Sequence, residues 1–558
     1  MIPFYARSVG YAVLLLIPVF TFGIYVWQNA VNVPYADDEA LIYTLNNVHD
    51  RPGELLRSLF HQHNDHRIFF SRLASVIIHF FSGTMNFRTM IIFGYLNLIL
   101  LGQSFFLIYR SFRQDFTFFL PVSLLLFSPI VYCTQLWSVT AFEQSLSIAF
   151  SLYCLYFLQQ EKQKIWYISL PFAMAAALAN LDGISVIPIA LFWLIIQKRK
   201  VESLIFGLFS VLYCYVFFLG FRFSSASRFP DPSQLISVVL KGFVALCGSI
   251  VKVVSDSYGY QMAVVLGAFI LITYIIFTTL KFFKVVGNER VKYQINLTEI
   301  CFFKVLACVL MIALGRSGDD AGVILSIRFQ IYSASIFVMF YLFVLNNLTN
   351  FKLEKLFFAA FLTTSLALNL LAYAKYQNAV KMHNEELIVD SFNYPQHGFF
   401  VHQYFRAPDP KTAFYNPYKF PVFFKTEVVS NWISQLRRQK EKVKASLKME
   451  ILRNSTDFPE SLYPIVRFEL SNLPSIVPQR DIYLALLDKN NKTLLIAIRP
   501  PMPGWINQLL GRNIPVNFLT VAFPKKMAGD FYDVALCWTN NNIPHSLLVA
   551  RNININPK

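Results

Sequence analysis

Long apolar stretches recur along the chain and limit what it can fold into. A helix that crosses the hydrocarbon core of a bilayer needs roughly 20 mostly apolar residues. The stretches that approach this length are 9–28, 90–109, 116–133, 139–158, 204–221, 260–280, 300–314, 328–345 and 356–373. The apolar range Ile165–Gln197 is interrupted by Asn180-Leu181-Asp182-Gly183, which predicts two short helices meeting at a polar turn. We therefore predict an α-helical polytopic membrane protein with about 11 transmembrane helices.

The composition agrees with a protein dissolved in lipid. Hydrophobic residues make up 55% of the 558 residues, charged residues 15%, and the mean hydropathy is +0.47. The net charge of +17 would suggest a nucleic-acid partner in a soluble protein, but here much of the excess lies in short loops between apolar runs. We expect membrane lipids, and no nucleic acid, as partners. The seven cysteines form no CxxC pair, so neither a zinc site nor a disulfide framework is expected.

The charges of the loops predict the orientation. Every second connection is short and basic, with Arg110 and Arg113, Lys162 and Lys164, Lys198 to Lys200, Lys281 to Lys292, and Lys352 and Lys355. The positive-inside rule places these connections in the cytoplasm together with the N-terminus, and Lys304 is expected to snorkel to the same side. The ranges expected outside are 29–87, 221–258, 315–327 and everything after Ala374. The expected location is a bacterial inner (plasma) membrane.

Three regions follow from this pattern. Residues 1–375 form the transmembrane domain, in which 29–87 is a first outer loop with surface helices. Residues 376–455 form a helical and aromatic connecting region, with a short helix over Met382–Phe392 and an amphipathic helix over Thr426–Arg453. Residues 456–558 alternate in short segments separated by turn signals, which predicts a small extracytoplasmic β-sandwich. Its expected strands are 465–473, 481–487, 493–498, 516–522, 532–538 and 546–550, with a hairpin turn at 488–491.

Acidic residues gather at the predicted outer ends of the helices. They are Asp37, Asp38, Glu39, Glu143, Asp182, Asp319 and Asp320. Ionisable groups at membrane depth are costly and usually functional, so a polar site at the outer face is the hypothesis. Asp37 and Asp38 could act as a general base, or they could cap the helix that follows, because acids favour a helix N-terminus. Both roles are compatible if one acid caps and the other reacts.

A histidine-rich segment follows in the same loop. It reads His61-Gln62-His63-Asn64-Asp65-His66-Arg67. Its histidines and Asp65 could bind a metal ion, but their spacing matches no zinc signature, so a hydrogen-bonded polar loop is the simpler interpretation. A divalent cation, Mg²⁺ or Mn²⁺, could instead be held between Asp37 or Glu39 and a substrate phosphate. No cofactor is assigned.

An acidic motif after the first helix, in a long outer loop with two surface helices, resembles the GT-C superfamily of glycosyltransferases. Protein O-mannosyltransferases and lipid A aminoarabinose transferases carry an Asp-Glu motif there, matched by Asp38-Glu39. Their His/Lys-Pro-Pro motif corresponds only by position to His63–Arg67, which lacks a proline pair. The chain is also similar to uncharacterised bacterial membrane proteins with a His-Asn-acid-His-Arg segment. Further similar segments are Ser128-Pro129, 180–183 followed by Pro188, and Gly315-Arg316 through Arg328 to Tyr332-Ser333.

The resemblance implies an inverting glycosyltransferase with a polyprenyl-phosphate sugar donor and a glycan, lipid or protein acceptor. Asp38, or Asp37, would take the proton of the acceptor hydroxyl. The substrate-binding residues would be Glu39, His63, Asp65, His66, Arg67, Glu143, Asp182, Arg316, Arg328 and Tyr332. Three of them, Arg67, Arg316 and Arg328, would meet the charge of the leaving phosphate. Arginines at helix starts also commonly hold lipid head groups, which is the alternative for Arg67 and Arg328.

Other classes of function remain open from the sequence. A transporter or flippase for an amphipathic lipid would also use intramembrane charges, but such proteins often show inverted repeats, and we find no repeat here. A non-catalytic subunit of cell-envelope assembly would bind a partner through its outer domain. A polysaccharide polymerase or ligase would also act outside, without a sequence feature that favours it.

Overall fold

The computed structural model describes residues 4–160, 165–223, 233, 235–255, 257–286, 295–316, 325–397, 434, 446–452, 465–472, 482–489, 493–498, 518–524, 531–540 and 543–554. The chain divides into two compact units. The first contains residues 1–30, 47–76 and 90–376, and the second contains residues 31–46, 77–89 and 377–558.

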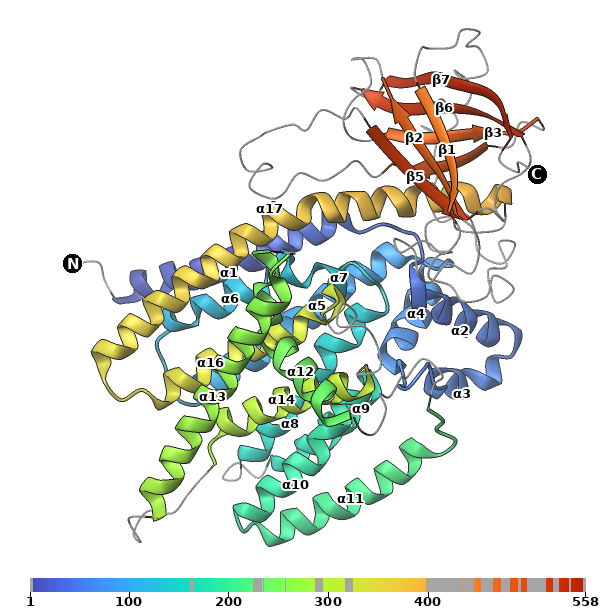
Figure 1. Ribbon diagram of the computed structural model, residues 1–558. Coiled ribbons are helices and arrows are strands. Elements are labelled where there is room, and N and C mark those ends of the chain that lie inside the picture. Colours follow the sequence, from blue (N-terminus) through green and yellow to red (C-terminus); the bar gives the residue numbers. More distant parts are fainter. Residues whose placement is uncertain are drawn as a thin grey trace. The chain divides into compact units, whose positions relative to one another are not determined.

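The helices follow the apolar stretches of the sequence (Figure 1). They are α1 (Phe4–Asn29), α2 (Glu39–Asp50), α3 (Leu55–Phe60), α4 (Phe69–Ser82), α5 (Phe87–Arg110), α6 (Leu120–Leu126), α7 (Tyr132–Gln135), α8 (Gln144–Gln159), α9 (Ser169–Ala179), α10 (Val186–Ile196), α11 (Lys200–Phe218), α12 (Leu235–Gly248), α13 (Gly259–Val286), α14 (Leu297–Gly315), α16 (Gln330–Asn347) and α17 (Phe351–His397). Within the described residues, ten helical segments are long and apolar enough to cross a membrane. The chain is an integral membrane protein, as its composition indicates.

Two of the apolar segments are broken at positions that the sequence marks. A 3-10 helix over Pro129–Val131 separates α6 from α7, since the proline ring cannot continue the preceding helix. A second 3-10 helix over Leu181–Ser185 separates α9 from α10, which confirms the predicted break. Gly183 is required there, because a Cβ atom at this position would lie 2.0 Å from the backbone oxygen of Ala176.

One predicted outer loop contains an apolar helix. The range 221–258 was expected outside the membrane, yet Leu235–Val253 is a segment long and apolar enough to span it. The chain on both sides of this segment lies at one end of the bundle: Arg222 is hydrogen-bonded to Gln62, and the Lys252 ammonium donates to the carbonyl of Leu325. Both contacts are with loops that the sequence places outside, at Gln62 and Leu325, so the orientation predicted for the helices after this segment stays a prediction.

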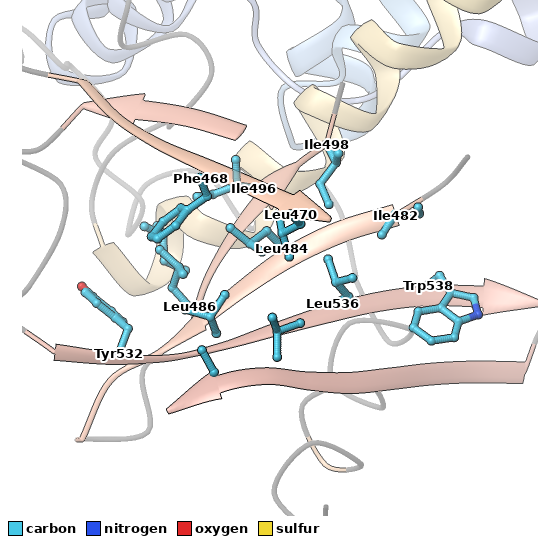
Figure 2. Packing of buried hydrophobic residues seen from close by; sticks show 14 residues of the cluster. Phe468, Leu470, Ile482, Leu484, Leu486, Ile496, Ile498, Tyr532, Leu536 and Trp538 are labelled. Atoms are coloured by element: carbon cyan, nitrogen blue, oxygen red, sulfur yellow. The ribbon is translucent and has the colours of Figure 1, made fainter. Parts of the chain in front are cut away.

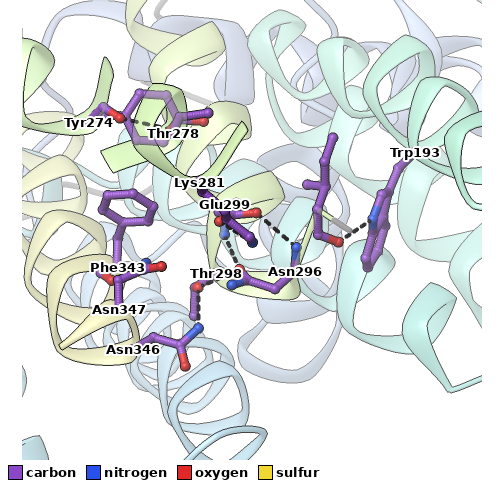
Figure 3. Close-up of polar contacts among 11 residues, drawn as sticks. Trp193, Tyr274, Thr278, Lys281, Asn296, Thr298, Glu299, Phe343, Asn346 and Asn347 are labelled. Carbon is purple, nitrogen blue, oxygen red and sulfur yellow. Dashed lines mark hydrogen bonds and ion pairs between the residues drawn. The ribbon is translucent and has the colours of Figure 1, made fainter. Parts of the chain in front are cut away.

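The basic connections of the first unit come together in space. Figure 3 shows part of this end, where Lys281 pairs with Glu299 at 2.6 Å and the Asn346 amide donates to Thr298 at 2.9 Å. Asn296 and Glu299 form a capping box that begins α14. Arg113 pairs with Glu354, which joins two further connections of the same predicted side.

The remaining connections meet at the opposite ends of the helices. The Thr134 hydroxyl donates to the carbonyl of Arg328 at 3.2 Å, and the Lys375 ammonium donates to the carbonyl of Lys252 at 2.8 Å. Loops predicted to share a side of the membrane are thus in contact, although their charges were the only basis for grouping them.

Helix α17 is one continuous helix of 47 residues. At 1.5 Å per residue it is ~70 Å long, about twice the thickness of the hydrocarbon core, so it extends beyond the bilayer. A transmembrane helix and a separate short helix over 382–392 were expected in this range. The two are a single element, because no residue between Tyr373 and Met382 is a glycine or proline that would end a helix.

The second unit contains two antiparallel sheets. Their strands are β1 (Ser446–Leu452), β2 (Ile465–Ser471), β3 (Ile482–Leu487), β4 (Thr493–Ala497), β5 (Phe518–Pro524), β6 (Phe531–Asn540) and β7 (Ile543–Asn554). The strand order is β1-β2-β5 in one sheet and β4-β3-β6-β7 in the other. Apolar side chains from both sheets share one core, which includes Phe468, Leu484, Leu536 and Trp538 (Figure 2). We call this pair of sheets the sandwich.

The sandwich confirms the six predicted strands and the β3–β4 hairpin. Its first strand was wrongly predicted. Ser446–Leu452, expected at the end of an amphipathic helix over 426–453, is β1 and pairs with β2 over its whole length. The sheet therefore begins before the predicted boundary at residue 456. The exposed Lys448 lies between the partly buried Leu447 and Met449, which pack against the core, and this alternation is typical of a strand. Of the rest of 426–453, only Ser434 belongs to the described residues.

Candidate functional site

The acidic motif of the first outer loop belongs to the second unit and has a strained backbone. Ala36 has a φ angle of +46°, which non-glycine residues rarely adopt. Asp38 follows at the end of a short 3-10 helix and is only 1% exposed, while Asp37 and Glu39 are partly exposed. Oδ2 of Asp38 accepts a hydrogen bond from the backbone N–H of Tyr35 at 2.9 Å. Asp38 thus satisfies a backbone donor at the start of the 3-10 helix Ala36–Asp38 that leads into α2, and the catalytic role of either acid stays a prediction.

The histidine-rich segment forms a tight turn in the first unit. The N–H groups of His63 and His66 donate to each other's carbonyls at 2.8 and 3.0 Å. Asn64 has a φ angle of +49°, a conformation that asparagine tolerates better than most residues, and Asp65 completes the turn. The two imidazole rings lie 5.9 Å apart between centroids. The turn therefore presents two histidines side by side, as a hydrogen-bonded polar loop would.

Glu143 faces this turn from the start of α8. Its carboxylate lies 3.5 Å from Nε2 of His66, and the glutamate is buried. Arg72 of α4 is also buried and donates to the carbonyl of His61. Sequence reasoning missed Arg72, although it is the single charged residue in the apolar stretch 68–78. The structure thus brings together a histidine, a carboxylate and a guanidinium.

Arg67 holds the turn to the end of α11. Its guanidinium donates to the carbonyls of Phe217, Leu219 and Phe60 and lies over the Phe217 ring. These contacts show a structural role, and the binding of a phosphate by Arg67 stays a prediction. Partial burial lowers the pKa of the neighbouring His61, and the charge of Arg72 adds to the lowering.

A second polar cluster lies at the break between α9 and α10. Oδ1 of the buried Asp182 accepts from the Ser147 hydroxyl at 3.0 Å. The Asn180 amide lies 3.4 Å from the Tyr332 oxygen. Ser147 is one turn below Glu143 on α8, so the two acids lie along one side of that helix.

Lys304 belongs to this second cluster and does not snorkel. Its side chain is 0% exposed, and its ammonium donates to the backbone carbonyl of Asp182 at 3.3 Å and to Sγ of Cys308. The expectation of a cytoplasm-facing lysine was wrong, because polar acceptors on α14 and at the helix break surround the amine within the bundle. An ammonium enclosed in a transmembrane bundle is a candidate functional group.

The remaining predicted residues, Arg316 and Arg328, also belong to the first unit. The Arg328 guanidinium covers the ring of Phe329 at 4.7 Å, and its carbonyl accepts from Thr134. Arg316 ends α14. Asp319 and Asp320, as well as Lys162, Lys164, Arg290 and Lys292, lie outside the described residues.

The structure therefore groups the predicted residues in three sets. The first unit holds His63, Asp65, His66 and Glu143 around the turn, and Asp182 with Tyr332 at the helix break. The second unit holds Asp37, Asp38 and Glu39. Among the residues that the structure describes, no three histidine, cysteine, aspartate or glutamate side chains are arranged to hold a metal ion.

Comparisons with known proteins identify no relative. No protein-family model matches the chain, and neither a curated protein nor a solved structure matches it.

Proposed function

We propose that the chain is an inverting glycosyltransferase that moves a sugar from a polyprenyl-phosphate donor to an acceptor hydroxyl at the outer face of the membrane. The observation that carries the proposal is the acidic motif directly after α1, where a strained residue precedes Asp37 and Asp38 and a hydrogen bond fixes Asp38. Strained backbone of this kind concentrates at functional sites. The resemblance of this motif to GT-C enzymes supplies the reaction.

The resemblance implies the following reaction. Asp37 or Asp38 takes the proton of the acceptor hydroxyl while its oxygen attacks the anomeric carbon from the face opposite the phosphate. The bond from that carbon to the phosphate oxygen breaks, and the phosphate leaves with the electron pair. Arg316, Arg328 and the histidines of the turn are the proposed partners of the phosphate, since charged donors stabilise a developing anion. Glu39, Asp65, Glu143, Asp182 and Tyr332 are the proposed partners of the sugar and acceptor.

The proposed orientation puts the N-terminus in the cytoplasm and the sandwich outside a bacterial inner membrane. The grouping of the basic connections at one end of the first unit supports this orientation through the positive-inside rule. A lipid-linked donor suits an outer site, because nucleotide sugars are normally confined to the cytoplasm.

The test compares Asp38→Asn with Asp37→Asn. Asparagine keeps an acceptor oxygen for the Tyr35 N–H, so Asp38→Asn removes the base while retaining the cap. The donor is first identified as the prenyl-phosphate sugar that co-purifies with the protein, by mass spectrometry. Turnover is then measured with and without a chelator, which also decides whether Mg²⁺ or Mn²⁺ takes part.

We expect one of the two variants to lose turnover by about 10²- to 10⁴-fold, the usual contribution of a general base, while donor binding is retained. The variant that keeps its turnover identifies the acid that has no part in proton transfer. Undiminished turnover in both variants would exclude the proposed mechanism.

A second candidate is a transporter or flippase for an amphipathic lipid. The buried Lys304 and Asp182 at a helix break favour it, because transporters place ionisable groups at broken helices. In sealed vesicles that contain the co-purified lipid, a flippase moves the lipid between leaflets without consuming it, whereas a transferase cleaves its sugar–phosphate bond.

A further inference from the structure

The last turns of α17 have two opposite contact faces within the second unit. Successive residues of an α-helix are rotated by 100°, so His383, Leu387 and Tyr394 share one face. Val389 and Phe392 point to the other side. Both faces are buried at the residues named, except for the partly exposed His383.

One face carries the sandwich. Val389 and Phe392 pack against buried side chains of the β4-β3-β6-β7 sheet, namely Tyr483, Ala485, Leu495, Ala497, Ala535, Cys537 and Leu548. Asn393 adds two hydrogen bonds to one residue of β4: its amide donates to the Leu495 carbonyl at 2.7 Å, and its Oδ1 accepts from the Leu495 N–H at 2.9 Å. The helix and the sheet are thereby joined by apolar contact and by hydrogen bonds.

The other face carries the segment that leads to the acidic motif. Leu387 and Tyr394 form a buried cluster with Val33, against which Val31 and Tyr35 pack. The Tyr35 ring also meets the His383 imidazole edge-on at 4.5 Å between centroids. The backbone N–H of this same Tyr35 holds the Asp38 carboxylate. A continuous series of side-chain and backbone contacts therefore connects the sheet, through α17 and Tyr35, to Asp38.

The segment is also held at the start of α5. Oδ1 of Asn32 accepts a hydrogen bond from the Phe87 N–H at 2.8 Å, where a helix has donors without partners of its own. A backbone with a positive φ at Ala36 persists only where its surroundings constrain it. The contacts with α17 supply that constraint on the side of Tyr35.

We propose that the sandwich and the end of α17 position the Asp37–Asp38 motif, with Leu387, His383 and Tyr35 as the positioning residues. The importance of this role for catalysis rests on the proposed function, but the role itself concerns only the conformation of residues 31–38. On this proposal the C-terminal region acts on the outer loop of its own chain and not on an external partner.

Hydrogen exchange of the full-length protein, followed by mass spectrometry, tests the proposal without any substrate. Leu387→Ala removes most of a side chain that is 4% exposed between α17 and the 31–35 segment. Phe392→Ala loosens the contact with the sheet, on the opposite face. The matched control is Ile543→Ala, in the sandwich but 58% exposed. Should Leu387→Ala fold poorly, His383→Ala removes only the ring contact with Tyr35.

We expect exchange at residues 31–38 to rise at least about tenfold in Leu387→Ala and to rise in Phe392→Ala. The truncation of a buried side chain commonly costs more free energy than a tenfold change in the local opening equilibrium requires. Ile543→Ala should match the native protein, and Leu387→Met should restore protection. Unchanged exchange at residues 31–38 in Leu387→Ala and His383→Ala would overturn the proposal.

Turnover then separates this proposal from the proposed function. If exchange rises and kcat falls while KM is unchanged, and Leu387→Met rescues both, positioning of a catalytic motif is supported. If exchange rises while kcat stays native, the positioning stands and the assignment of the motif to catalysis is wrong.

Discussion

Lys304 and Asp182 are ionisable residues in a region of the bundle that solvent does not reach, and the Lys304 amine donates to the backbone carbonyl of Asp182 at 3.3 Å. Transfer of either charge from water into such surroundings costs several kcal/mol, and the cost is met only when the two are present together with hydrogen-bond partners. Ser147 is such a partner of Asp182, and Cys308 is one of Lys304. We therefore expect each charge to be tolerated chiefly because the other one is there.

This expectation can be measured with a double-mutant cycle. Lys304→Met should lower the free energy of unfolding in detergent by about 3–5 kcal/mol, because it leaves a buried carboxylate without a neighbouring positive charge. Lys304→Met with Asp182→Asn should cost clearly less than the sum of the two single changes. Lys241→Met, at an exposed position of α12, is the control and should stay within about 0.5 kcal/mol. Additive costs would show that the two charges are independent.

Individual site residues could be predicted only as far as their chemistry shows in the sequence. Glu143 and Asp182 were found because acids are conspicuous inside apolar runs. The partner of Lys304 could not be found, since Asp182 lies 122 positions away and only the bundle brings the two together. Arg72 was overlooked because its neighbour Arg67 offered a more evident basic residue, which the structure shows donating to carbonyls.

Among the helices, α12 and α13 approach each other unusually closely. A Cβ atom on Gly267 would lie 1.9 Å from the backbone oxygen of Val244, and one on Gly248 would lie 2.1 Å from that of Ala263. Small residues let helix backbones come close in a membrane, where packing replaces the hydrophobic effect as the source of association. These two glycines are therefore the contact points of the pair.

Gly267→Ala should destabilise the protein by about 1–3 kcal/mol or more, since the added methyl group meets backbone that cannot rotate away. The matched control is Gly207→Ala in α11, where the nearest side-chain atom would be 3.7 Å from the new Cβ. That change should be neutral or slightly stabilising, because alanine favours helix. Thermal unfolding in detergent distinguishes the two, and equal melting temperatures for both variants would contradict the close approach.

The elements could be predicted where the periodicity of the sequence was unambiguous. Six strands and the break at 180–183 follow from alternation and from a polar interruption. α12 was missed because the range 221–258 was assigned to one side from the charges of the loops around it, and its apolar segment was not counted among the helices. β1 was missed because its lysine-rich surroundings suggested a basic helix, while its pairing with β2 over residues 465–471 is visible only in the folded sheet.

For the molecule as a whole, the contacts between connecting loops predict on which side of the membrane each loop lies. Arg222 and Tyr258, which flank α12, should both be exposed outside, and Lys355 should face the cytoplasm. Single cysteines at these positions are labelled with an impermeant maleimide in intact cells, after Cys133 and Cys214 have been replaced. The other cysteines are buried.

We expect positions 222 and 258 to react from outside and position 355 to react only after permeabilisation. Labelling of 222 and 258 from opposite sides would mean that α12 crosses the membrane, and the predicted orientation of everything after it would have to be reversed.

The amide of Asn393 has a consequence for how copies of this protein behave towards one another. β4 is an outer strand of its sheet, and Leu495 offers there the N–H and C=O that an incoming strand would use. Because a side chain of the same molecule already occupies both groups, this border resists the edge-to-edge joining that leads sheets to polymerise. Loss of the amide would expose the border, and the protein would become more prone to form aggregates during extraction from the membrane.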